Sequence, residues 1–102
     1  MRRGEVWWYE APHEKARPIL VLTRDEHIDR QLDVIAVPAT RTVRGWDTEI
    51  HIGVADSMPA ESVLNVGNTF LAKQAYLTQH ITALSSVRMT EVCRMLTYAT
   101  NC

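Results

Sequence analysis

Short apolar runs, separated by polar or proline-containing segments, limit what this chain can fold into. Residues 4–9, 19–23 and 33–39 are rich in β-branched, aromatic and other apolar side chains, and residues 48–52 alternate between polar and apolar. Both patterns predict β-strands. Shorter runs at 62–66 and 79–82 predict two more. The sequence therefore predicts a mainly β fold of five or six short strands.

One helical pattern follows the strands. Ser85 is a suitable helix N-cap. Behind it, an apolar stripe with the spacing i, i+3, i+4 and i+7 is formed by Met89, Val92, Cys93 and Leu96. A small, strongly bent antiparallel barrel with a C-terminal helix (mainly β, α+β) suits this order of elements. We expect the barrel to close, because closure hides strand edges that would otherwise be exposed.

Local features refine the strands. Val6 and Trp8 share one face of a strand by its period of two, so Trp8 is expected in the core. Pro38 lies near the end of the third strand and predicts that ladder pairing stops there. The highly charged residues 24–32 are expected to form a surface excursion with one helical turn.

Composition limits the class of protein. A length of 102 residues fits a single domain spanning 1–102, and 46% hydrophobic residues can support a packed core. No apolar run approaches the ~20 residues that a membrane span needs, and the N-terminus lacks the pattern of a signal peptide. The two cysteines, Cys93 and Cys102, encode neither a disulfide framework nor a zinc site. We therefore expect a cytoplasmic protein without a metal or cofactor.

The charge pattern is ambiguous. A net charge of −1 is unusual for a protein that binds nucleic acid, although a local basic patch matters more than the sum. Arg41 and Arg44 lie in the stretch 34–46, which contains no acidic residue. From charge alone a solvated surface is the better interpretation, and an anion-facing loop is the alternative.

Five segments in register resemble the MazF/PemK/Kid toxins. They are Arg3-Gly4-Glu5-Val6-Trp7, Arg17 to Asp25, Val34 to Thr40, Ser62 to Val66, and Ile81 to Ser85 with the helix behind it. Together they cover nearly the whole chain. The resemblance implies a CcdB/MazF-like, SH3-like barrel, a homodimer, and sequence-selective cleavage of single-stranded RNA. It also implies neutralisation by a cognate MazE-like antitoxin, whose C-terminal segment covers the RNA groove.

The chemistry that the resemblance implies needs no metal ion. The ribose 2′-hydroxyl attacks the adjacent phosphorus, giving a 2′,3′-cyclic phosphate and a 5′-hydroxyl, while the enzyme moves protons and stabilises charge on the phosphate. A guanidinium suits the latter task, and the resemblance assigns it to Arg17; an arginine that only begins a strand is the alternative. Thr40 matches the family's hydroxyl after the third strand, and could donate to phosphate or bond the loop backbone.

Further site residues are predicted around this pair. His13, in the loop before Arg17, could accept the 2′-hydroxyl proton, and an exposed histidine without a role is the alternative. Trp46 is the best base-stacking candidate. The residues predicted to bind RNA are Arg41, Arg44, Trp46, Asn65 and Asn68. Three other histidines, His27, His51 and His80, are expected singly on the surface and not as metal ligands.

Two positions depart from the Kid branch of the family. There an arginine and an aspartate are assigned as acid and base, and this chain carries Asn65 and Gly67. The departure favours chemistry based on Arg17 and Thr40. It also leaves open a degenerate toxin that binds its antitoxin without cutting RNA. A CcdB-like, non-enzymatic gyrase poison is another alternative, although the chain lacks the Trp-Gly-Ile-type ending of that group.

Overall fold

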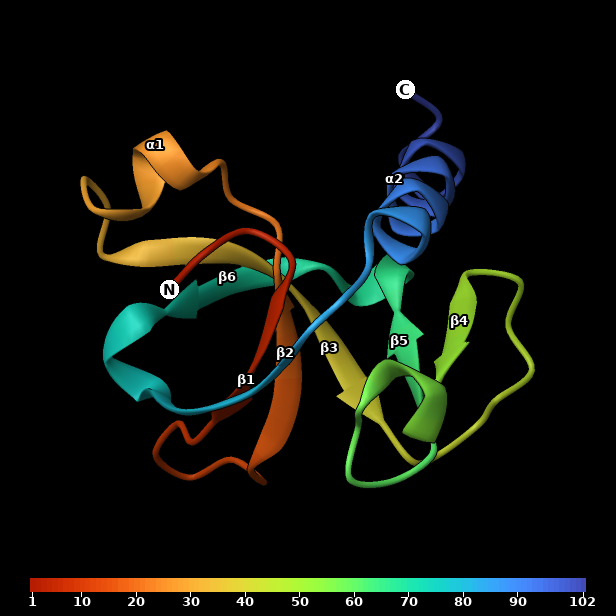
Figure 1. Cartoon of the computed structure of the whole chain (residues 1–102), viewed down its shortest axis with the longest axis horizontal. Helices are drawn as coiled ribbons and strands as arrows, with labels where there is room; N and C mark the ends of the chain where they lie inside the picture. Colours follow the sequence, from red (N-terminus) through yellow and green to blue (C-terminus); the bar gives the residue numbers. More distant parts are fainter.

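Seven antiparallel strands form one curved sheet in the computed structural model, which describes residues 1–102 (Figure 1). The strands are β1 (Glu5–Tyr9), β2 (Arg17–Val21), β3 (Asp33–Thr40), β4 (Glu49–Ile52), β5 (Ser62–Asn65), β6 (Phe70–Lys73) and β7 (Leu77–Ala83). The α-helices are α1 (Asp25–Ile28) and α2 (Ser86–Thr100), and the 3₁₀ turns are η1 (Val54–Asp56), η2 (Val66–Asn68) and η3 (Gln74–Tyr76). The mainly β fold with a C-terminal helix is confirmed.

Strand β3 organises the sheet, whose order is β4-β5-β3-β2-β1-β7 with β6 also paired to β3. Its first half pairs with β6, as in Ala36 opposite Phe70, and its last residues pair with β5, as in Ala39 opposite Leu64. The prediction that pairing stops at Pro38 is wrong. Pro38 lies between the two sets of partners and is itself paired with Ile19 of β2. A missing N–H is tolerated where the strand changes partner.

The sheet does not close, so the predicted closed barrel is wrong. Strands β6 and β7 follow one another in the chain but do not pair. The turn η3 between them directs its polar groups elsewhere: Gln74 donates its backbone N–H to Leu32, and the Tyr76 carbonyl accepts from Glu10. These bonds hold the turn against neighbouring loops, so no ladder forms across the gap. Strand β6 was not predicted from sequence, because its short run lacks β-branched residues and it forms by pairing with β3.

Two apolar clusters lie on opposite faces of the sheet. Along β2, Ile19 and Val21 belong to one cluster and Leu20 to the other, which explains why this strand is almost continuously apolar. Helix α2 covers the cluster that contains Leu20. The fully buried Val92 belongs to this cluster, and the partly buried Met89 and Leu96 pack against it. Each buried aliphatic side chain of this kind contributes about 1.5–3 kcal/mol.

Helix α2 begins as predicted. The Ser85 hydroxyl accepts a hydrogen bond from the backbone N–H of Arg88 at 3.2 Å, and Asn101 ends the helix in the left-handed conformation with φ 57°. Cys93 lies at the edge of the apolar stripe and is only partly buried. No helix in the structure is both long and apolar enough to cross a bilayer.

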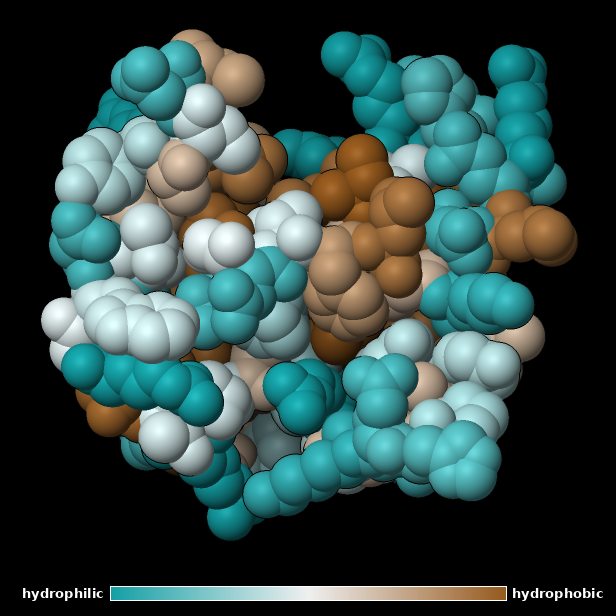
Figure 2. Space-filling model, turned by 180° about the vertical axis from the view of Figure 1, so that it is seen from behind, coloured by the Kyte–Doolittle hydropathy of each residue, from teal (hydrophilic) through white to brown (hydrophobic).

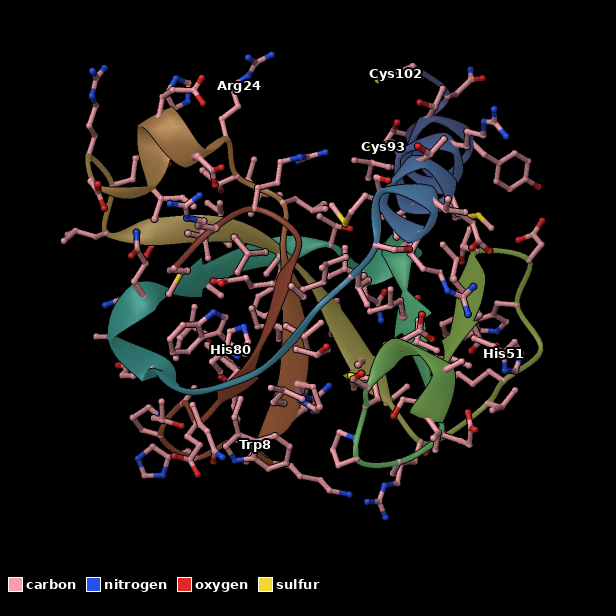
Figure 3. All side chains as sticks on the ribbon, in the orientation of Figure 1. Trp8, Arg24, His51, His80, Cys93 and Cys102 are labelled. Carbon is pink, nitrogen blue, oxygen red and sulfur yellow. The ribbon has the colours of Figure 1, made fainter.

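Trp8 is not in the core, contrary to prediction. The pairing of β1 with β7 shifts register twice, between Val6 and Trp7 and between Trp8 and Tyr9. The extra residues lie on β7, so the alternation along β1 is kept: Val6 belongs to one apolar cluster, whereas Tyr9 and the partly buried Trp7 pack in the other. Trp8 belongs to neither cluster: it stays half-buried and lies at the lower edge of the molecule in Figure 3.

Candidate functional site

A groove of about 470 Å³ lies between the start of β2 and the end of β3 on one side and the β4–β5 connection on the other. The loops that border it reach the lower edge of Figure 1. Its lining combines basic, small polar and apolar side chains. The lining residues used below are Trp8, Lys15, Arg17, Thr40, Arg41, Arg44, Met58, Pro59, Ala60, Ser62, Asn65 and Asn68.

Arg17 begins β2 at the groove. Pro18 behind it pairs with Trp8 of β1, which places the indole beside the arginine along the same wall. The Arg17 side chain is half-buried and is absent from the ion pairs of the molecule, which join Arg24 to Glu26, His80 to Glu5, and Arg88 to both Asp56 and Glu91. Its guanidinium is therefore free to bind an external anion.

Thr40 ends β3 at the same groove. Its Oγ1 accepts a hydrogen bond from the backbone N–H of Thr42 at 3.1 Å. This bond uses an oxygen lone pair and leaves the hydroxyl proton free. Both sequence interpretations of Thr40 are thus compatible, since the oxygen orders the loop while the O–H can still donate to a bound anion. Arg17 and Thr40 line one groove, as a shared phosphate would require.

The groove is basic although the protein is not. Its charged lining residues are Lys15, Arg17, Arg41 and Arg44, and no aspartate or glutamate lines it. Positive charge is therefore concentrated in the groove, although the net charge of the chain is −1. A concave surface lined by one sign of charge concentrates ligands of the opposite sign. The groove is suited to a polyanion.

A carboxylate orders the loop after β3. Glu49 accepts hydrogen bonds from the backbone N–H of Arg44 at 3.1 Å and of Gly45 at 3.0 Å, and Gly45 has the positive φ of 76° that this tight turn requires. The Arg44 guanidinium lies 5.2 Å from the centroid of the Trp46 ring. Trp46 is 49% exposed and lies outside the groove lining, connected to it through Arg44.

Asn65 and Asn68 also line the groove, at the end of β5 and in η2. The Asn65 side chain is only 3% exposed, and its Oδ1 is buried without a hydrogen-bond partner. A Cβ at Gly67 would lie 3.2 Å from Thr48 Oγ1 and 3.7 Å from Asn65 Oδ1. The position of the Kid-type aspartate, the base, is thus a glycine packed beside Thr48, and the groove holds no carboxylate to replace it.

The histidines do not gather in the groove. His13 is exposed, has a φ of 63°, and is not among the lining residues, so its catalytic role stays a prediction. His27, His51 and His80 are exposed, as predicted, and Figure 3 shows His51 and His80 on different sides of the molecule. No group of three or more His, Cys, Asp or Glu side chains is placed to hold a metal ion.

Sequence reasoning missed several lining residues. Lys15 and Trp8 could have been found from their positions, because Lys15 precedes Arg17 by two residues and Trp8 lies opposite Pro18 in the ladder. The opposite wall, formed by Met58, Pro59 and Ala60, had no such signal. Its position depends on contacts between segments that are distant in the sequence.

Comparison with known proteins identifies the family. The model of PemK-like, MazF-like toxins of type II toxin–antitoxin systems matches residues 2–99. The chain is 39% identical over 103 residues to the probable endoribonuclease MazF2 of Mycobacterium tuberculosis, covering 100% of both chains. It is 34% identical over 101 residues to the probable endoribonuclease MazF5 of the same organism, covering 98% of this chain and 93% of the relative.

Solved structures agree on the fold. The Mycobacterium tuberculosis toxin MazF-mt6 superposes with a TM-score of 0.85 at 26% identity, covering 95% of this chain and 96% of the toxin. A mycobacterial endoribonuclease in complex with its cognate antitoxin superposes with a TM-score of 0.85 at 23% identity, covering 99% of this chain and 95% of the relative. The chain therefore belongs to the PemK-like, MazF-like toxin family of type II toxin–antitoxin systems.

Proposed function

We propose that this toxin is an endoribonuclease that binds single-stranded RNA in the groove and cleaves it without a metal ion. One observation carries the proposal. Arg17 and Thr40, which come from different strands, line a groove with four cationic side chains and no carboxylate. The relatives named as endoribonucleases match this chain along its whole length, which supports the same activity here.

Arg17 and Thr40 divide the work on the scissile phosphate. As the ribose 2′-oxygen attacks phosphorus, negative charge grows on the non-bridging oxygens. The unpaired Arg17 fork binds two of these atoms, and its fixed charge stabilises the transition state more than the ground state. The free Thr40 proton donates to the same phosphate. His13, whose loop leads into Arg17, is the predicted acceptor of the 2′-hydroxyl proton, and Arg17 is the predicted donor of the proton that the leaving 5′-oxygen takes up.

The RNA follows the basic loop away from the cleavage point. Arg41 and Arg44 contact backbone phosphates, while Asn65 and Asn68 offer amide groups to base edges or ribose. Trp46 stacks with one unpaired base, on the side of its ring not covered by Arg44. Since phosphate contacts release counterions, binding is expected to weaken steeply with salt.

The same groove accounts for an antitoxin partner. A solved relative is bound to its cognate antitoxin, and MazE–MazF assemblies of Deinococcus radiodurans share the fold. A groove without carboxylates favours an acidic C-terminal antitoxin segment that competes with RNA for the cationic side chains. We propose a cytoplasmic location, which membership of a toxin–antitoxin family and an RNA substrate support.

We also propose that the toxin is a homodimer. Ile35 and Leu71 are directly opposite each other on β3 and β6, and both are exposed. Figure 2 shows a hydrophobic patch on the rear face of the molecule, where the outward surface of these strands lies. An exposed cross-strand apolar pair of this kind suits a contact with a second copy.

Mapping of cut sites on a long transcript tests the proposed function. The wild-type protein should cut at a defined short motif in the presence of EDTA and leave cyclic phosphate ends. Uncut RNA, together with tight binding of the antitoxin, would instead identify the degenerate toxin, for which the glycine at position 67 is the supporting observation. Supercoiled DNA with gyrase provides the parallel assay for a CcdB-like poison.

A further inference from the structure

Asp56 is an almost fully buried carboxylate at the end of η1. Its side chain is 7% exposed and accepts two hydrogen bonds from Arg88 of α2, from Nε at 2.8 Å and from Nη2 at 3.2 Å. It also accepts a hydrogen bond from the backbone N–H of Gly53 at 3.0 Å. The hydrogen bonds from Arg88 hold the pKa of Asp56 below its ordinary value. A buried charge with this many donors is strongly tied to one geometry.

Further bonds fix both partners of the pair. Arg88 also donates a hydrogen bond from Nη1 to the carboxylate of Glu91 at 2.9 Å, one turn further along α2. The backbone carbonyl of Asp56 accepts from the Thr82 hydroxyl of β7 at 3.0 Å. The η1 turn is therefore held to a helix and a strand that both lie outside the groove.

The chain that leaves η1 forms one wall of the groove. Met58, only two residues after Asp56, is 4% exposed and packs in the same cluster as Leu84 and Val92. Met58 also lines the groove with Pro59 and Ala60, and these three residues are called here the 58–60 wall. The opposite side carries Arg17 and Thr40, which belong to sheet strands. The position of the 58–60 wall thus sets the width of the groove.

We propose that Arg88 and Asp56 are positioning residues for the RNA substrate. Neither lines the groove, yet their pairing fixes the 58–60 wall at the distance from Arg17 at which RNA fits. The inference rests on the proposed function, and it adds that the affinity for RNA depends on helix α2. A guanidinium that donates two hydrogen bonds to one carboxylate fixes the relative orientation of the two side chains, in addition to attracting them. A lysine at position 88 would attract Asp56 without fixing this orientation.

Kinetics separate this role from a structural one. Loss of folded protein lowers the apparent kcat and leaves KM unchanged, because fewer molecules bind with normal affinity. A displaced wall instead raises KM, since Arg17 and Thr40 stay in place on their strands. The R88M variant is expected to raise KM roughly tenfold, because a displaced wall removes binding contacts that the ground state and the transition state share. Its kcat should stay within about twofold.

The experiment uses five variants of the full chain. R88M and D56N each break the pair, and their double mutant should raise KM no further than the single variants, because one interaction is lost in all three. R94M is the matched control, since Arg94 has the same charge on the same helix, is exposed and forms no ion pair. R94M should keep wild-type KM. If R88M does not fold, R88K decides: it retains the charge and should give an intermediate KM.

Binding is measured in parallel with an oligonucleotide carrying a 2′-deoxy residue at the cut site, which cannot be cleaved. The Kd should rise in step with KM. A wild-type KM in both R88M and R88K, or a similar rise in R94M, overturns the inference while the endoribonuclease assignment stands. A wild-type protein that neither cuts nor binds RNA overturns the proposed function and this inference with it.

Discussion

Arg17→Ala should lower kcat/KM for RNA cleavage by roughly 10²–10³-fold, the cost of losing one preorganised donor from a charge-stabilising site. The structure separates this loss from unfolding. Arg17 is half-buried and forms no ion pair, so its removal should change the free energy of unfolding by no more than about 0.5 kcal/mol. In transition-state terms the lost stabilisation is about 2.7–4 kcal/mol.

The measurement is single-turnover cleavage of a short fluorogenic single-stranded RNA at fixed ionic strength, with thermal unfolding of each variant followed in parallel. Arg17→Lys separates charge from geometry, because it keeps one positive charge without the planar fork. It should recover only part of the rate. Arg41→Ala is the matched control, since it removes the same charge from the same groove.

Two results would refute the reasoning. If Arg17→Ala keeps more than about a tenth of wild-type kcat/KM, Arg17 does not supply the predicted stabilisation of the transition state. If Arg41→Ala loses as much as Arg17→Ala with no change in salt dependence, then the groove acts only through its summed charge. Arg17 would then have no particular role in the chemistry.

Four further outcomes are expected. Thr40→Val should lower kcat roughly 10- to 100-fold while Thr40→Ser stays near wild type, because a donated hydrogen bond to a charged group is lost only in the first; equal losses would implicate the methyl group. Trp46→Ala should weaken RNA binding by about 1–3 kcal/mol in fluorescence anisotropy, with Trp46→Phe retaining most of it, and unchanged affinity in both would remove the stacking role. The pKa of Asp56 is lowered in the fold by Arg88, so its contribution to stability is present above its ordinary value of 3.8 and is lost as the pH falls through the lower folded value. Urea unfolding between about pH 6 and pH 2 should therefore show a shallower loss of stability on acidification for Asp56→Asn than for wild type, and parallel curves would contradict the pairing. Leu71→Lys should shift the protein toward monomer in sedimentation, whereas Val87→Lys, a control on the exposed side of α2, should not; a dimer in both would exclude the β3–β6 patch.

Periodicity in the sequence determined the parts of the fold that depend on neighbours along the chain. The alternation in β4, the apolar stripe of α2 and the Ser85 cap each reflect local geometry, and each is found in the structure. The Arg17-Pro18 pair was likewise visible as a strand start because proline fixes its own backbone. The order of the five motifs along the chain indicated the family, and the match of the family model to residues 2–99 confirms it.

Only the tertiary structure decided which segments meet. Trp8 lies beside the groove and outside both apolar clusters, which depends on the segments that meet there, and Pro38 is accommodated because β3 changes partner beside it. The Arg88 and Asp56 side chains, 32 positions apart, join only when α2 packs on the sheet. A sequence pattern specifies the face on which a side chain lies, whereas the partner that it meets depends on long-range packing of the whole chain. For that reason the two walls of the groove differ: the strand wall was predictable from sequence and the 58–60 wall was not.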